Sequence, residues 1–89
     1  MKIFSERLRE LRQEKSLSMK ALAKILNTSD VAINNWENGI NEPKISYLKQ
    51  IAIYFDVSCD YLLGLEDETG SKFINSFNNF SNSGNIEIK

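Results

Sequence analysis

Apolar residues recur every three or four positions through most of the chain, as they do in amphipathic helices. Four longer segments and one short one carry this spacing, within about residues 3–15, 18–26, 29–37, 43–55 and 58–63. The expected core positions of the first four segments are Phe4, Leu8, Leu11, Leu22, Ala23, Leu26, Ile33, Trp36, Ile45, Leu48, Ile51, Ala52 and Phe55, and the short fifth segment contains Cys59, Tyr61, Leu62 and Leu63. No segment of residues 1–65 alternates with period two, so the pattern predicts an all-α bundle of five helices.

Residues with known preferences for helix ends lie between these segments. Ser18, either Thr28 or Ser29, and Ser58 are suitable N-caps for the second, third and fifth helices. Pro43 suits the first turn of the fourth helix, because that position needs no backbone amide hydrogen.

The expected helix ends carry residues that tolerate unusual backbone angles. Asn27 lies where the chain must turn sharply, and Asn accepts the left-handed conformation better than most residues. Gly39 and Gly64 follow the third and fifth helices, where glycine is the common residue past a C-cap. Residues 17–39 therefore predict two short helices joined by a tight turn. The second of them has an apolar side and an amide-rich side, which is how a protein presents a helix to the DNA major groove.

Composition restricts the chemistry that the chain can perform. Its 89 residues are 42% hydrophobic and suit one small domain. The chain has no His and a single cysteine, Cys59, which we expect to be a small, partly buried apolar residue. We therefore expect no disulfide, metal, cofactor or catalytic activity. The N-terminus lacks a basic segment followed by an apolar run, and no apolar run reaches about 18 residues, so we expect a cytoplasmic protein and no membrane partner.

The charge is nearly balanced, with a formal net charge of −1 and a pI of about 5.4. Residues 1–65 carry nine Lys/Arg and eight Asp/Glu, whereas residues 66–89 carry two Lys and four Asp/Glu. The acidity therefore lies in the C-terminal part. A nucleic-acid partner would have to meet a few well-placed cations and helix N-termini in place of a strongly basic surface.

The composition changes after Leu65, which divides the chain into a domain of residues 1–65 and a linker and tail of residues 66–89. Residues 75–85 are rich in Asn and Ser, while Phe73, Phe77 and Phe80 share the spacing of one helix face. Residues 85–89 alternate like a short strand. Two interpretations stay open: the apolar face packs on the domain, on a second subunit or on another protein, or the segment is a disordered connection.

The part of the chain from Phe4 to Leu65 resembles the phage repressor and Cro helix-turn-helix family. The matching parts are Leu8-Arg-Glu-Leu-Arg12, Leu17-Ser18, Leu22-Ala23, Ile33, Trp36-Glu37-Asn38-Gly39, Pro43, Leu48, Ile51-Ala52 and Val57-Ser58-Cys59-Asp60-Tyr61-Leu62-Leu63-Gly64. The resemblance implies a compact five-helix bundle with a helix-turn-helix. It also implies a transcriptional regulator, most often a repressor, that binds a palindromic DNA operator as a homodimer.

The resemblance assigns roles to particular residues. Base edges would be contacted by Asp30, Val31, Asn34 and Asn35. DNA phosphates would lie near Lys20, Asn38, Gly39 and Lys44. Arg12 and Glu37 match positions that often form an ion pair. The chain departs from the family at Met19, where the family frequently has a phosphate-binding Gln, and at Asp30, where Gln, Arg or Ser is more usual.

The residue chemistry leaves alternatives to these roles. Val31 suits a thymine methyl, Asn34 and Asn35 suit adenine, and Asp30 suits the amino group of cytosine or simply the N-terminus of its own helix. Near-neutral charge and Asp30 also fit two other functions. One is a protein-interaction module of the same fold that binds DNA weakly or not at all, and the other is an antitoxin, which binds both a toxin and DNA.

Overall fold

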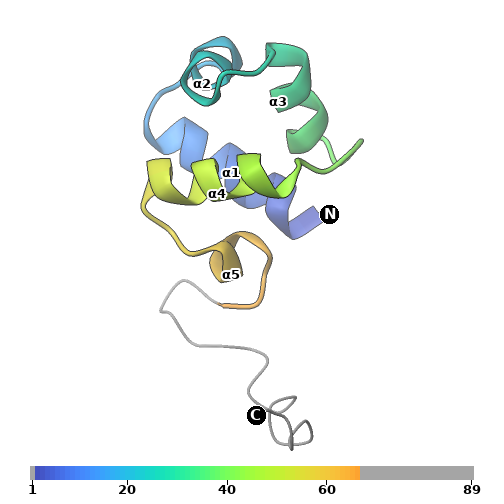
Figure 1. Ribbon diagram of the computed structural model, residues 1–89, viewed down its shortest axis with the longest axis vertical. Coiled ribbons are helices and arrows are strands. Elements are labelled where there is room, and N and C mark those ends of the chain that lie inside the picture. Colours follow the sequence, from blue (N-terminus) through green and yellow to red (C-terminus); the bar gives the residue numbers. More distant parts are fainter. Residues whose placement is uncertain (1, 67–89) are drawn as a thin grey trace, which may run out of the picture.

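The computed structural model describes residues 2–66 of the chain. This part contains five helices joined by short connections (Figure 1). They are α1 (Lys2–Glu14), α2 (Met19–Leu26), α3 (Asp30–Glu37), α4 (Ile45–Phe55) and α5 (Cys59–Leu62). In Figure 1, α2 and α3 form an upper pair, α1 and α4 cross the middle, and α5 lies below them. The all-α five-helix prediction is confirmed for this part of the chain. The predictions for Phe73, Phe77 and Phe80 and for residues 85–89 lie outside the described residues.

Serine side chains begin three of the helices. The Oγ atoms of Ser18, Ser29 and Ser58 accept hydrogen bonds from amides three residues later, at 3.0, 3.1 and 2.9 Å. Each bond satisfies one of the amides that have no partner within the first turn. Ser29, and not Thr28, is therefore the N-cap of α3. The Thr28 amide instead donates to the Ala23 carbonyl at 2.8 Å and completes the end of α2.

All five described helices end in the same way. The amide of a left-handed residue donates to the carbonyl three residues earlier, and the next amide donates to the carbonyl five residues earlier. The left-handed residues are Ser16, Asn27, Gly39, Asp56 and Gly64. The expected turns at Asn27, Gly39 and Gly64 are confirmed. Gly64 is also required by space, because a Cβ atom there would lie 2.9 Å from Ile3 Cγ2.

The hydrophobic core lies between the helices and contains eleven buried residues. They are Phe4, Leu8, Leu22, Ala23, Leu26, Ile33, Trp36, Ile51, Ala52, Phe55 and Leu62. Trp36 is only 5% exposed, as expected for a core residue. Leu11, Leu48 and Cys59 are partly buried against this cluster. Among the described residues, no helix is long and apolar enough to cross a membrane.

The N-terminal end of α4 differs from the prediction in two ways. Pro43 precedes the helix instead of occupying its first turn. Lys44 is the N-cap, with an extended backbone (ψ 157°) that cannot continue a helix back to Pro43. Ile45 is 83% exposed although it lies on the apolar face. That face is buried at Ala52 and Phe55 and only partly buried at Leu48, so α4 leaves the core toward its N-terminus.

Candidate nucleic-acid interface

One side of α3 packs into the protein and the other side faces solvent. Ile33, Trp36 and Glu37 are buried, which fixes the rotation of the helix. Asp30, Val31 and Asn34 are therefore exposed, and Asn35 is half-buried at the edge of the same surface. Val31 is 63% exposed, so its apolar side chain is accessible to a ligand. The four residues expected to contact base edges thus lie on or beside one accessible face of α3.

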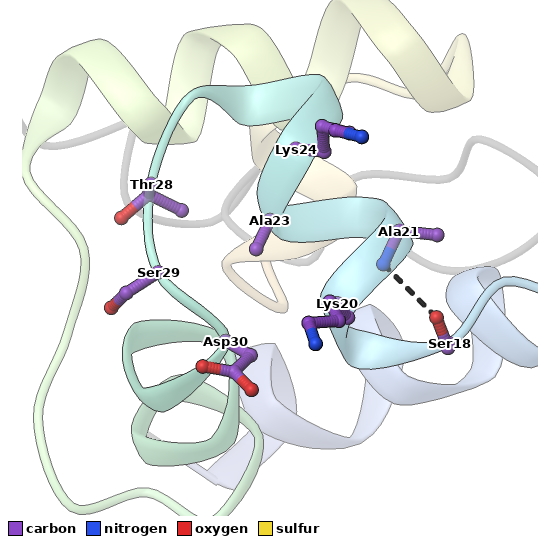
Figure 2. Close-up of a pocket in the computed structure, with 8 residues that line it drawn as sticks. All are labelled: Ser18, Lys20, Ala21, Ala23, Lys24, Thr28, Ser29 and Asp30. Atoms are coloured by element: carbon purple, nitrogen blue, oxygen red, sulfur yellow. Dashed lines mark hydrogen bonds between the residues drawn. The ribbon is translucent and has the colours of Figure 1, made fainter.

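Two open hollows lie next to this face. The smaller one, of about 290 Å³, is lined by Met19, Asp30, Val31 and Asn34, and it joins the first turn of α2 to α3. The larger one, of about 610 Å³, runs along the α2–α3 turn. Figure 2 shows Lys20 and Lys24 on the α2 side of this hollow and Thr28, Ser29 and Asp30 on the other. Two cations therefore line the hollow beside the α2–α3 turn.

The N-terminus of α4 is distinct from the serine-capped helix starts. Its N-cap residue, Lys44, makes no side-chain capping hydrogen bond and is exposed. First-turn amides carry partial positive charge, and the Lys44 ammonium adds a full charge beside them. An anion such as a phosphate suits this position.

The end of α3 restricts what Gly39 and Asn38 can bind. The amides of Gly39 and Ile40 donate to the carbonyls of Trp36 and Asn35, at 3.3 and 2.9 Å. The Asn38 side-chain amide donates to Asn34 and accepts from Arg9. These groups already have partners inside the protein. Gly39 therefore shapes the turn, and its amide is not an open donor for a phosphate.

Glu37 is a buried carboxylate held by arginines of α1. The side chain of Glu37 is fully buried, and Arg12 donates to its two oxygens from Nε at 2.6 Å and from Nη2 at 3.0 Å. Arg12 also donates to the Leu17 carbonyl at 2.8 Å, just before α2. The hydrogen bond to Glu37 raises the pKa of the Arg12 guanidinium, partial burial opposes the rise, and the Glu37 charge adds to it. Arg12 thereby links α1, the end of α3 and the approach to α2.

Two residues of this region were missed by sequence reasoning. Lys24 lines the larger hollow, one helical turn after Lys20. Its spacing of four residues from Lys20 was the available signal, because such residues share a helix face. Arg9 of α1 reaches the end of α3 and donates to the Glu37 carbonyl at 2.9 Å. Nothing in the local sequence separates Arg9 from the other charges of α1.

The five-helix fold and the exposed face of α3 are those of a helix-turn-helix protein, and comparison with known families agrees. Residues 8–62 match the helix-turn-helix family, and the chain belongs to that family. Among solved structures, it is similar to the P22 c2 repressor, determined in complex with a synthetic operator. The two share 34% identity with a TM-score of 0.64, over 66% of this chain and 89% of that one.

Curated relatives carry the same domain within longer proteins. The HTH-type transcriptional activator BcrR of Enterococcus faecalis is 41% identical over 72% of this chain and 31% of its own length. The HTH-type transcriptional regulator AnsR of Bacillus subtilis (strain 168) is 35% identical over 71% of this chain and 54% of its own length. The chain thus spans from about a third to about half of these two relatives.

Proposed function

We propose that the chain is a sequence-specific DNA-binding domain of a transcriptional regulator. The exposed face of α3, with Asp30, Val31 and Asn34, is the observation that carries this proposal. The buried side of the helix holds that face outward without using its polar groups in the core. The similarity to an operator-bound repressor and to named transcriptional regulators supports the same function.

In this proposal α3 enters the major groove while other groups meet the DNA backbone on either side. Lys20 neutralises a phosphate next to the first turn of α2. Lys44 and the first-turn amides of α4 bind a second phosphate. Lys24 lies near enough to Lys20 to contribute to the first of these contacts. Asn38 and Gly39 support the interface by closing α3 and not by donating to phosphate.

Base recognition follows from the chemistry of the α3 side chains. Val31 packs against a thymine methyl group, and the Asp30 carboxylate accepts from the amino group of cytosine. Asn35 reads adenine, because its amide offers both a donor and an acceptor. Since Asn35 is half-buried, its contact lies at the edge of the footprint.

The domain acts as a homodimer in this proposal and binds a palindromic operator in the cytoplasm. Two copies of α3 would then read half-sites about one helical turn apart, roughly 34 Å. Repression follows when the operator overlaps a promoter. A reporter gene under such a promoter should be expressed less when the protein is present. Increased expression would instead indicate an activator, the role for which BcrR is named.

Selection of bound fragments from a random DNA pool tests the proposal. We expect an enriched palindromic motif whose half-sites are separated by about one helical turn. Asn35→Ala should change the enriched base at one position of each half-site and leave the other positions as they were. Failure to retain any fragment at about 50 mM salt would contradict DNA binding, because non-specific attraction is strong there. The protein-interaction module would then be the remaining function.

A further inference from the structure

A chain of hydrogen bonds connects α1 to the exposed face of α3. Arg9 Nη2 donates to Asn38 Oδ1 at 3.3 Å. Asn38 Nδ2 donates to the backbone carbonyl of Asn34 at 2.8 Å and to its side-chain Oδ1 at 3.0 Å. Arg9 is a partly exposed residue of α1, and Asn34 belongs to the outer face of α3. We call this the Arg9–Asn38–Asn34 chain.

Arg9 itself is held in place by Glu37. Its Nη2 atom donates to the Glu37 carbonyl at 2.9 Å, and its Nε atom lies 3.5 Å from the buried Glu37 carboxylate. These two contacts hold the partly exposed guanidinium between α1 and the end of α3. Arg9 is therefore held where it can orient the side-chain amide of Asn38 and, through it, that of Asn34.

The direction of the chain follows from the chemistry of the guanidinium. An asparagine amide presents oxygen on one side and nitrogen on the other, and the two are interchangeable by a flip. Arginine offers only donors and the Asn34 carbonyl only accepts, so together they turn the Asn38 oxygen toward Arg9 and its nitrogen toward Asn34. Asn34 in turn places its oxygen toward Asn38. Its own NH₂ group is then the part left for a ligand.

We infer that Asn34 reads DNA as a hydrogen-bond donor and that Arg9 is a positioning residue for this contact. Guanine presents two acceptors, O6 and N7, to the major groove, whereas adenine presents one acceptor and one donor. An amide whose oxygen is directed at Asn38 matches guanine and is poorly placed for the two-bond contact with adenine. The inference rests on the proposed DNA binding. It replaces the adenine preference expected for Asn34 from its residue type alone.

Selection from a random DNA pool, repeated with variants, tests the inference. Asn34→Ala identifies the base pair that Asn34 contacts, because only that position loses its preference. In the unchanged protein we expect guanine there, favoured over adenine by about tenfold, within the range of a good side-chain to base contact. Arg9→Gln should reduce this ratio to about threefold or less, because Gln also offers an acceptor and no longer fixes the Asn38 amide.

Two further variants separate positioning from a general structural effect. Asn38→Ala changes an exposed residue and removes the link while Arg9 keeps its bonds to Glu37, so it should also relax the guanine preference. Arg9→Lys retains a donor-only group and should restore the preference. Urea unfolding of each variant shows that it is folded, and loss of stability alone would lower binding to every sequence without changing the preferred base.

The outcomes distinguish this inference from the proposed function. Adenine at the position identified by Asn34→Ala would overturn the inference. So would an unchanged guanine preference in both Arg9→Gln and Asn38→Ala. Either result leaves sequence-specific DNA binding intact. If the unchanged protein selects no DNA at all, the proposed function fails and the inference fails with it.

Discussion

At the residue scale, Glu37 is the most informative side chain of the described structure. It is a charged residue with 2% exposure, and it lies one residue before the end cap of α3. Its carboxylate accepts two bonds from Arg12, and its carbonyl accepts one from Arg9. A buried charge without partners costs several kcal/mol, so the arginines of α1 are needed wherever Glu37 is kept.

The Arg12–Glu37 pair gives a prediction about stability. Arg12→Met leaves the buried carboxylate without its two strongest bonds and should lower the free energy of unfolding by about 3–5 kcal/mol. Glu37→Leu should cost less, because Arg12 and Arg9 are partly exposed and can turn toward water. Urea unfolding of both variants and of the double variant measures the coupling. A double variant whose loss equals the sum of the two single losses would show that the pair contributes nothing.

At the element scale, the helix ends show how short helices are held in a small domain. Each described helix closes with two amide-to-carbonyl bonds around a left-handed residue. Three of those residues, Ser16, Asn27 and Asp56, carry a Cβ atom that makes this conformation unfavourable. The same closure at Gly39 leaves the Asn38 side chain beside α3, where it can bond to Asn34. The way in which α3 ends therefore affects the exposed face of α3 as well as the stability of the domain.

Serine-to-glycine substitutions at two exposed positions test whether a left-handed residue with a Cβ atom lowers stability. Ser16→Gly removes an unfavourable left-handed Cβ and should raise the free energy of unfolding by up to about 1 kcal/mol. Ser46→Gly is the matched control, because Ser46 lies exposed within α4. Glycine there should lower the free energy of unfolding by about 0.5 kcal/mol. Thermal and urea unfolding measure both, and shifts of the same sign would contradict the prediction.

At the scale of the whole molecule, electrostatic attraction to DNA is limited by the balance of charge. Residues 2–66 carry nine Lys/Arg and nine Asp/Glu. Arg12 and Arg9 form ion pairs with Glu37. Arg7 donates to the carbonyls of Tyr61 and Glu66 and stacks on the Tyr61 ring. Lys20 and Lys24 line the hollow beside the α2–α3 turn, and Lys44 lies at the start of α4. Specific contacts must therefore provide much of the affinity.

The salt dependence of binding checks this distribution of charge. If three lysines per domain each neutralise one phosphate, log K should fall with log salt with a slope of about −2.7 per domain. Lys44→Ala should make the slope less steep by about 0.9 and weaken binding to all sequences alike. Lys15→Ala is the matched control, because Lys15 lies over Tyr54 near the opposite end of α4. Equal effects of the two substitutions would show that Lys44 does not meet a phosphate.

Several local features of the fold were predicted correctly from the sequence, and two features of α4 were not. Ser18 and Ser58 were expected as caps, Asn27 as a left-handed turn and Trp36 as a core residue, and the structure agrees. The caps and the turn depend on interactions within about five residues along the chain, and the inward position of Trp36 follows from helical periodicity. Ile45 was placed wrongly because its periodicity reports which face of α4 it occupies but not where the core ends. Pro43 was misplaced by two residues, since Lys44 adopts an extended backbone.

The sequence by itself determined the helices, their caps, most of the core and the family, because helical periodicity and capping are local properties. It also indicated which residues occupy the outer side of α3. Only the tertiary structure decided how those side chains are directed. Arg9 and Asn38 are 29 residues apart and meet through the packing of α1 against α3. That contact and the Asn34 carbonyl together orient the Asn38 amide, and Asn38 in turn holds the Asn34 oxygen, so a residue of α1 contributes to the proposed DNA contact.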